Sequence, residues 1–89
     1  MTEAEPQICV HGLGYVGLPT AAVLANSGYE VYGFDADPDH RSDLMEGSFD
    51  IEEPDLDRFV RRALEDGLRI VSQPREAEFH VICVPTPYD

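Results

Sequence analysis

A chain of 89 residues makes one small domain or part of one, and this chain carries 18 acidic and 6 basic side chains, a formal net charge of −12 at pH 7. This balance excludes nucleic acid and anionic membrane surfaces as partners, because few cations are present to neutralise phosphate. The sequence shows neither an apolar stretch long enough to span a bilayer nor a signal peptide, so we expect a cytoplasmic protein.

The first predicted elements are a loose tail over residues 1–6 and a buried strand over residues 7–11, which ends in Gly12-x-Gly14-x-x-Gly17. Gly12 permits a tight turn off the strand, Gly14 lets a pyrophosphate approach the backbone, and Gly17 lets the next helix pack closely on the sheet. A helix-like pattern follows at once. This order predicts a dinucleotide site, against the alternative of a glycine turn without a ligand.

A helix is predicted over residues 15–27. Its N-terminus directs unpaired N–H groups, among them those of Tyr15 and Val16, toward the expected phosphates. The second strand, residues 30–34, is followed directly by Asp35. A carboxylate at this position accepts hydrogen bonds from both hydroxyls of a ribose and repels a 2′-phosphate, which predicts NAD as the cofactor.

Two alternatives to this interpretation of Asp35 stay open. The side chain is an ordinary solvated acid at a strand end in one of them. In the other, Arg41 receives a 2′-phosphate and the cofactor is NADP. We rank NADP behind NAD, because its phosphate would lie against the Asp35 carboxylate.

The remaining elements complete an α/β pattern. They are a helix over 37–46, a helix that opens at 51–54 and ends before 67, a strand over 68–72, a turn or single helical turn over 74–78, and a strand over 79–84. Right-handed crossovers then give a parallel sheet of strand order 3-2-1-4 with helices on both faces, a Rossmann-like half. A dinucleotide fold has two such halves, so we expect residues 1–89 to be a fragment whose second half is absent.

The carboxyl ends of the first and fourth strands form the expected crevice, because the strand order reverses there. Thr86 follows the fourth strand between Pro85 and Pro87, which stiffen the loop and offer a hydroxyl to the cofactor. An ordinary strand-to-helix loop is the alternative. His40 lies five residues beyond Asp35, close enough for its ring to meet the adenosine.

The other polar residues are interpreted as structural. His11 and His80 are scattered along the chain, and the acids at 52–53 are favoured by a helix dipole rather than paired for acid–base chemistry. Cys9 and Cys83 form no C-x-x-C, and no histidine spacing completes a metal site, so both are expected to be small buried hydrophobic residues. We therefore predict no metal site and no catalytic residue.

The acidic residues are spread along the chain, and lysine is absent. Such a charge repels itself at low salt. The composition favours a halophilic protein of a very salty cytoplasm, where the screening length is about 3 Å or less. An ordinary acidic mesophile is the alternative.

Three segments, in this order and spacing, resemble the UDP-sugar 6-dehydrogenase family, which includes the UDP-glucose and UDP-N-acetylmannosamine dehydrogenases. The segments are Gly12-Leu-Gly-Tyr-Val-Gly-Leu-Pro-Thr-Ala-Ala, Ile51-Glu-Glu-Pro-Asp-Leu and Val84-Pro-Thr-Pro. The resemblance covers residues 7–88, and Pro19-Thr20 and Pro85-Thr86-Pro87 are more similar to the N-acetylmannosamine branch.

The resemblance implies an enzyme that oxidises the C6 alcohol of a UDP-sugar to a carboxylate in two NAD-dependent steps. It implies NAD contacts at Tyr15, Val16, Asp35 and Thr86. The family often has Lys or Arg where this chain has His40, so the contact at His40 is not implied by the resemblance. The family's catalytic residues and substrate domain come later than residue 89. The fragment is thus expected to be inactive alone, and the full-length protein to be a homo-oligomer.

Two other functions stay open. One is a nucleotide-sensing regulatory Rossmann module, which has no reason to carry the Glu-Glu-Pro helix start or the Pro-Thr-Pro loop. The other is a different NAD dehydrogenase with the same first half.

Overall fold

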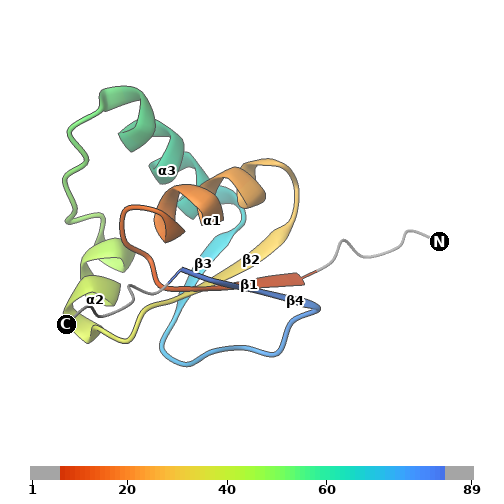
Figure 1. Cartoon of the computed structure of the whole chain (residues 1–89). Coiled ribbons are helices and arrows are strands. Elements are labelled where there is room, and N and C mark those ends of the chain that lie inside the picture. Colours follow the sequence, from red (N-terminus) through yellow and green to blue (C-terminus); the bar gives the residue numbers. More distant parts are fainter. Residues whose placement is uncertain (1–6, 84–89) are drawn as a thin grey trace, which may run out of the picture.

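The computed structural model describes residues 7–83, which form a four-stranded parallel sheet and three helices (Figure 1). The elements are β1 (Gln7–His11), α1 (Gly17–Asn26), β2 (Glu30–Phe34), α2 (Pro38–Glu46), α3 (Pro54–Asp66), β3 (Leu68–Val71) and β4 (Phe79–Ile82). Every helix and strand expected from the sequence is present. The strand order β3-β2-β1-β4 confirms the predicted order.

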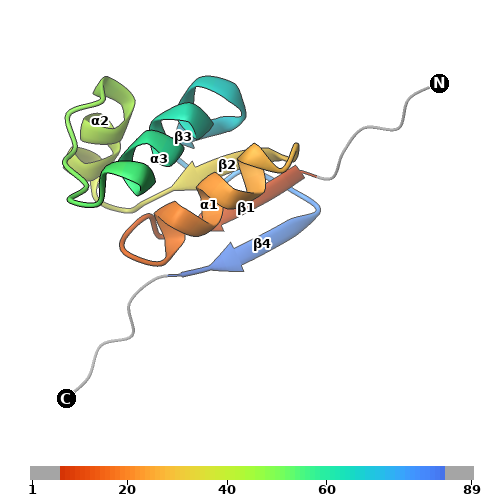
Figure 2. The same ribbon diagram turned by 90° about the horizontal axis from the view of Figure 1, so that it is seen from above.

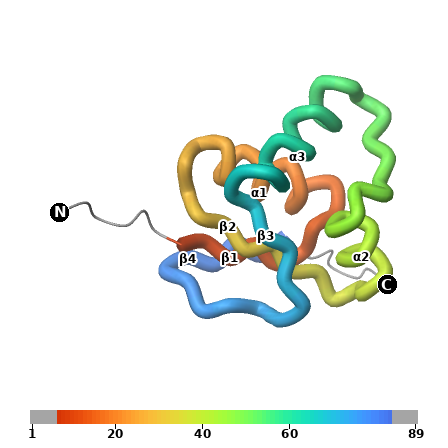
Figure 3. Tube along the Cα trace, turned by 180° about the vertical axis from the view of Figure 1, so that it is seen from behind, coloured from red at the N-terminus to blue at the C-terminus, as the bar shows by residue number. Residues whose placement is uncertain are grey.

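The helices are arranged differently from the prediction. α1 and α3 cover one face of the sheet, and α2 lies near the carboxyl ends of the strands (Figures 1 and 2). The segment 72–78, which joins β3 to β4 without a helix, crosses the opposite face (Figures 1 and 3). The expectation of helices on both faces is therefore met on one face only, because this connection is short and contains Pro74.

The core lies between the sheet and the helices α1 and α3. β1 is central and pairs with β2 and β4, so its alternate side chains point to opposite faces. Ile8 and Val10 point into the helix-covered core, whereas Cys9 is buried on the other face. The core is formed by buried apolar residues of β1, β2 and β3, of the connection between β1 and α1, and of the three helices: Ile8, Val10, Leu13, Leu18, Ala21, Ala22, Ala25, Val31, Leu44, Val60, Ala63 and Leu68.

Side-chain caps confirm the predicted starts of α2 and α3. Asp37 precedes α2 and its carboxylate accepts from the backbone N–H groups of Asp39 (3.0 Å) and His40 (3.4 Å). Glu53 caps α3 in the same way and accepts from Asp55 N (2.6 Å). This placement supports the interpretation of the acids at 52–53 as helix-start residues. Within residues 7–83, no helix has the length and apolar character needed to cross a membrane.

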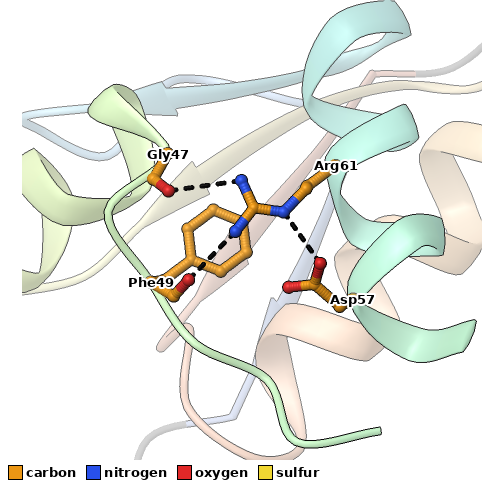
Figure 4. A network of polar contacts seen from close by, with 4 residues as sticks. All are labelled: Gly47, Phe49, Asp57 and Arg61. Carbon is orange, nitrogen blue, oxygen red and sulfur yellow. Dashed lines mark hydrogen bonds and ion pairs between the residues drawn. The ribbon is translucent and has the colours of Figure 1, made fainter. Parts of the chain in front are cut away.

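Arg61 of α3 holds the connection between α2 and α3 in place (Figure 4). Its Nε donates to Asp57 Oδ2 (2.8 Å), one turn earlier on the helix. Its two terminal nitrogens donate to the backbone oxygens of Gly47 (3.2 Å) and Phe49 (3.0 Å). The guanidinium also lies 4.3 Å from the centroid of the Phe49 ring. One side chain thus ties residues 47–49 to α3.

We expect Arg61→Ala to lower the free energy of unfolding by about 1–3 kcal/mol, because two backbone oxygens lose a charged donor and Phe49 loses its stacking partner. Urea unfolding measures this change. Arg62→Ala is the matched control, since Arg62 is exposed on the same helix and its loss should shift stability by no more than about 0.5 kcal/mol. Equal losses in the two variants would show that the network is not stabilising.

Candidate nucleotide-binding site

The glycine turn, residues 12–17, joins β1 to α1 at the carboxyl edge of the sheet. Gly12 has φ 96°, a left-handed conformation that favours glycine, and its N–H donates to Phe34 O (2.7 Å). A Cβ on Gly17 would lie 1.6 Å from the backbone oxygen of Gly12, so no larger residue fits there. A Cβ on Gly14 would meet nothing within 4 Å. The turn is therefore tightly packed on its inner side and open at Gly14.

The N-terminus of α1 is open to solvent. Val16 precedes the helix without a side-chain cap, and no acidic residue lies in the first turn. Among the described residues, nothing accepts a hydrogen bond from the N–H groups of Gly14, Tyr15 or Val16. Tyr15 is fully exposed and Val16 is 65% exposed. Free donors and the positive end of a helix dipole thus face an open space, which is what an anion requires.

Asp35 is attached to this turn. Its Oδ2 accepts from Leu13 N (2.8 Å) and its Oδ1 accepts from Asp37 N (3.0 Å). The side chain is partly buried, so it is a fixed carboxylate rather than a freely solvated acid. A carboxylate oxygen has more than one acceptor position, so both oxygens retain capacity for further donors.

His40 also contacts Leu13, at its backbone oxygen. Its Nε2 lies 2.8 Å from Leu13 O, and because a carbonyl only accepts, Nε2 carries the proton. Arg41 donates to Asp35 O (2.8 Å), and its guanidinium lies 5.9 Å from the centroid of the Phe34 ring. Sequence reasoning missed Leu13, since its role here depends on main-chain atoms and no side-chain pattern marks them.

The acid–base behaviour of Asp35 follows from these contacts. Burial by itself raises the pKa of the Asp35 carboxyl. The hydrogen bonds from Leu13 and Asp37, together with the nearby His40 and Arg41, outweigh burial and hold that pKa below its ordinary value. The ionised form is therefore the one that the fold favours.

This depressed pKa predicts a loss of stability in acid. The folded state holds the Asp35 proton less tightly than the unfolded state, so its contribution is complete above the unfolded pKa of about 3.9 and is lost as pH falls through the folded pKa. We expect Asp35→Asn to lose less unfolding free energy than the parent between about pH 6 and pH 3. Urea unfolding across this range measures the difference. Asp43→Asn, at an exposed position of α2, should follow the parent curve. Coincident curves for all three proteins would refute the assignment.

A groove of about 530 Å³ adjoins the turn. It is lined by residues 13–15, by the start of α1, by His40 and by the connection at residues 49–52. The Arg61 network described above fixes the beginning of that connection. The groove thus joins the open side of the glycine turn to α2.

The structure brings most of the sequence-predicted residues to this one edge of the sheet. They are Gly12, Gly14, Tyr15, Val16, Gly17, Asp35 and His40, from the ends of β1 and β2 and the starts of α1 and α2. Thr86 and its two flanking prolines lie outside the described residues.

Comparisons with known proteins find matches over most of the chain. The model of the UDP-glucose/GDP-mannose dehydrogenase family, NAD binding domain, matches residues 6–89. The UDP-N-acetyl-D-mannosamine dehydrogenase of Methanococcus vannielii is 45% identical over 82 residues, which are 91% of this chain and 19% of that protein. A structure of the UDP-N-acetyl-mannosamine dehydrogenase Cap5O of Staphylococcus aureus matches with a TM-score of 0.85 and 36% identity, over 93% of this chain and 20% of that one.

A more distant structure also matches. The GDP-mannose dehydrogenase of Pseudomonas aeruginosa, solved as a ternary complex, has a TM-score of 0.76 and 28% identity over 92% of this chain and 20% of that one. The chain thus spans about a fifth of the length of the relatives that it matches.

Proposed function

Because the chain belongs to the NAD-binding domain of the UDP-glucose/GDP-mannose dehydrogenase family, we propose that residues 1–89 are the N-terminal half of the cofactor domain of a UDP-sugar 6-dehydrogenase. The whole protein would oxidise the C6 alcohol of a UDP-sugar to a carboxylate. The second half of the cofactor domain, the substrate domain and the catalytic residues would belong to other parts of the protein. The fragment alone would be inactive.

The observation that carries this proposal is the open space at Gly14 beside the uncapped start of α1. NAD, when bound, supplies the hydride acceptor. The N–H groups of Tyr15 and Val16 would bind its diphosphate, which takes up the free donors and the positive helix end. This fit needs no cation near the phosphates, which is consistent with an acidic chain.

Asp35 would bind the adenosine ribose. Its carboxylate oxygens are held toward the turn by Leu13 and Asp37, and their remaining lone pairs can accept from the two ribose hydroxyls. The same negative charge would oppose a 2′-phosphate and favour NAD over NADP. His40, whose Nε2 is engaged by Leu13, would contact the adenosine through its ring, and Thr86 would offer its hydroxyl from the loop after β4.

The substrate would be UDP-N-acetylmannosamine rather than UDP-glucose. Two of the relatives described above carry that activity in their names, and the Pro19-Thr20 and Pro85-Thr86-Pro87 segments support the same branch. Steady-state assays of the full-length protein with each UDP-sugar decide the point. A higher kcat/KM for UDP-glucose would overturn the choice of branch and leave the reaction class intact.

The cellular setting is part of the proposal. Cys9 and Cys83 are free thiols, which is the usual state in a reducing cytoplasm. The charge of −12 supports a high-salt cytoplasm, where distant acids are screened from the phosphates of NAD. We also propose that the full-length protein is a homo-oligomer.

Gly14→Ala tests the site without disturbing the fold. The new Cβ meets nothing within 4 Å, so the thermal midpoint should stay that of the parent. The same methyl group would occupy the space of the diphosphate, so NAD affinity measured by calorimetry should fall at least about tenfold, which is about 1.4 kcal/mol. A folded Gly14→Ala variant that binds NAD as tightly as the parent would overturn the proposed site.

A further inference from the structure

The face of the sheet opposite α1 and α3 carries a cluster of metal-ligating side chains. Cys9, His11 and His80 each offer one ligand atom, and these atoms all lie within 4.8 Å of one another. A ring nitrogen of His11 (Nε2) lies 2.9 Å from one of His80 (Nδ1), although the two residues are 69 positions apart in the sequence. We propose that these three residues bind Zn²⁺ or a similar transition-metal ion.

The sheet register brings the three ligands together. Cys9 and His11 are two residues apart on β1 and therefore share a face. His80 is the register partner of Cys9 on the adjacent strand β4, so its side chain points to that face as well. The cluster therefore sits on backbone that regular strand pairing holds in place, and it is separated by the sheet from the core under α1 and α3.

The distances are close to those of a tetrahedral site. With metal–sulfur bonds of about 2.3 Å and metal–nitrogen bonds of about 2.0–2.1 Å, the ligand atoms are separated by about 3.3–3.6 Å. The two ring nitrogens therefore need to part by a few tenths of an ångström, and the thiol needs to approach them. Side-chain rotations supply such movements without a change in strand pairing.

The donor set selects the metal. One thiolate and two imidazoles suit Zn²⁺, Co²⁺ and copper, whereas Ca²⁺ and Mg²⁺ prefer oxygen ligands. Cys9 is fully buried, His11 is partly buried and His80 is exposed, so the cluster opens from the thiol outward to solvent. Three protein ligands leave a fourth position for water or another donor. The chain's negative charge also raises the local concentration of cations.

A bound ion would join β4 to its neighbour β1. This site is independent of the proposed NAD site, because its residues point away from the helix-covered core and none of them contacts the glycine turn's free N–H groups. The alternative is a pair of hydrogen-bonded histidines above a buried cysteine, with no ion.

Cobalt titration of the metal-free full-length protein tests the proposal. We expect one equivalent of Co²⁺ to give a thiolate-to-cobalt charge-transfer band with the visible bands of tetrahedral cobalt, and Zn²⁺ to displace it. Zn²⁺ should also raise the thermal midpoint. Cys9→Ser should remove the charge-transfer band. His80→Gln should weaken Co²⁺ binding by more than tenfold, because losing a residue that only hydrogen-bonds to a metal ligand already lowers metal affinity by about 10–100-fold.

Cys83→Ser is the matched control, because Cys83 packs against the helix-side core and should not affect the cobalt spectrum. His80→Gln removes a different ligand, and His80 is exposed within the described residues, so this variant keeps the test valid if Cys9→Ser does not fold. Absence of a thiolate band, or a band that survives in His80→Gln at parental affinity, would overturn the proposal. A band lost in Cys83→Ser and kept in Cys9→Ser would also overturn it.

Discussion

Gly17→Ala is expected to destabilise the chain by about 3 kcal/mol or more. Its Cβ would lie 1.6 Å from Gly12 O and 2.7 Å from Gly12 C, which are backbone atoms of the same tight turn. Overpacking that flexible side chains can relieve costs about 1–3 kcal/mol, and here the turn itself must move. A loss of this size is a large fraction of the stability of a small domain.

Urea unfolding and circular dichroism of Gly17→Ala measure this effect. Gly14→Ala is the matched control, since both substitutions add one methyl group to the same turn and only one of them meets other atoms. The two variants therefore separate a defect in folding from a defect in binding. Parental stability in Gly17→Ala would mean that the turn relaxes freely and that close packing of α1 does not depend on this glycine.

Asp35→Ala is expected to weaken NAD binding by at least about tenfold and to narrow the difference between NAD and NADP. Two effects contribute. The ribose hydroxyls lose a charged acceptor, which is worth about 1.5–3 kcal/mol for a hydrogen bond to a charged group. The N–H of Leu13 also loses its partner, which loosens the turn.

Calorimetric titration with both cofactors at one salt concentration distinguishes these effects. A loosened turn weakens NAD and NADP equally, whereas loss of the carboxylate changes their ratio. Asp43→Ala, at an exposed position of α2, controls for net charge and should leave both affinities unchanged. A parent protein that binds NADP better than NAD would refute the role of Asp35. Equal losses for the two cofactors would restrict Asp35 to holding the turn.

The order of the elements could be predicted because each has a local cause. Apolar runs mark the strands and an apolar stripe marks α3, while Asp37 before Pro38 and Gly47 mark the two ends of α2. These signals act over a few residues and are visible in the sequence. The strand order followed from the short connections and from the usual handedness of crossovers. The glycine spacing and Asp35 placed the candidate cofactor site on one edge of the sheet for the same reason.

Other features depend on contacts between distant segments. Arg61 donates to the side chain of Asp57 and to the backbone oxygens of Gly47 and Phe49, and no side-chain pattern in the sequence predicts the two backbone contacts. The coverage of one face alone depended on whether residues 72–78 would form a helix. The sequence predicts either a turn or a single helical turn over residues 74–78.

The sequence by itself determined the parallel α/β fold, the glycine turn and the family, since these rest on residue types at short fixed spacings. Only the tertiary structure decided that Asp35 and His40 form hydrogen bonds with the main chain of Leu13. It also decided that His11 and His80 lie side by side on one face of the sheet. The physical reason is that strand register and main-chain hydrogen bonds join residues far apart in the chain. The spacing of residues along the sequence does not predict which distant residues these contacts bring together.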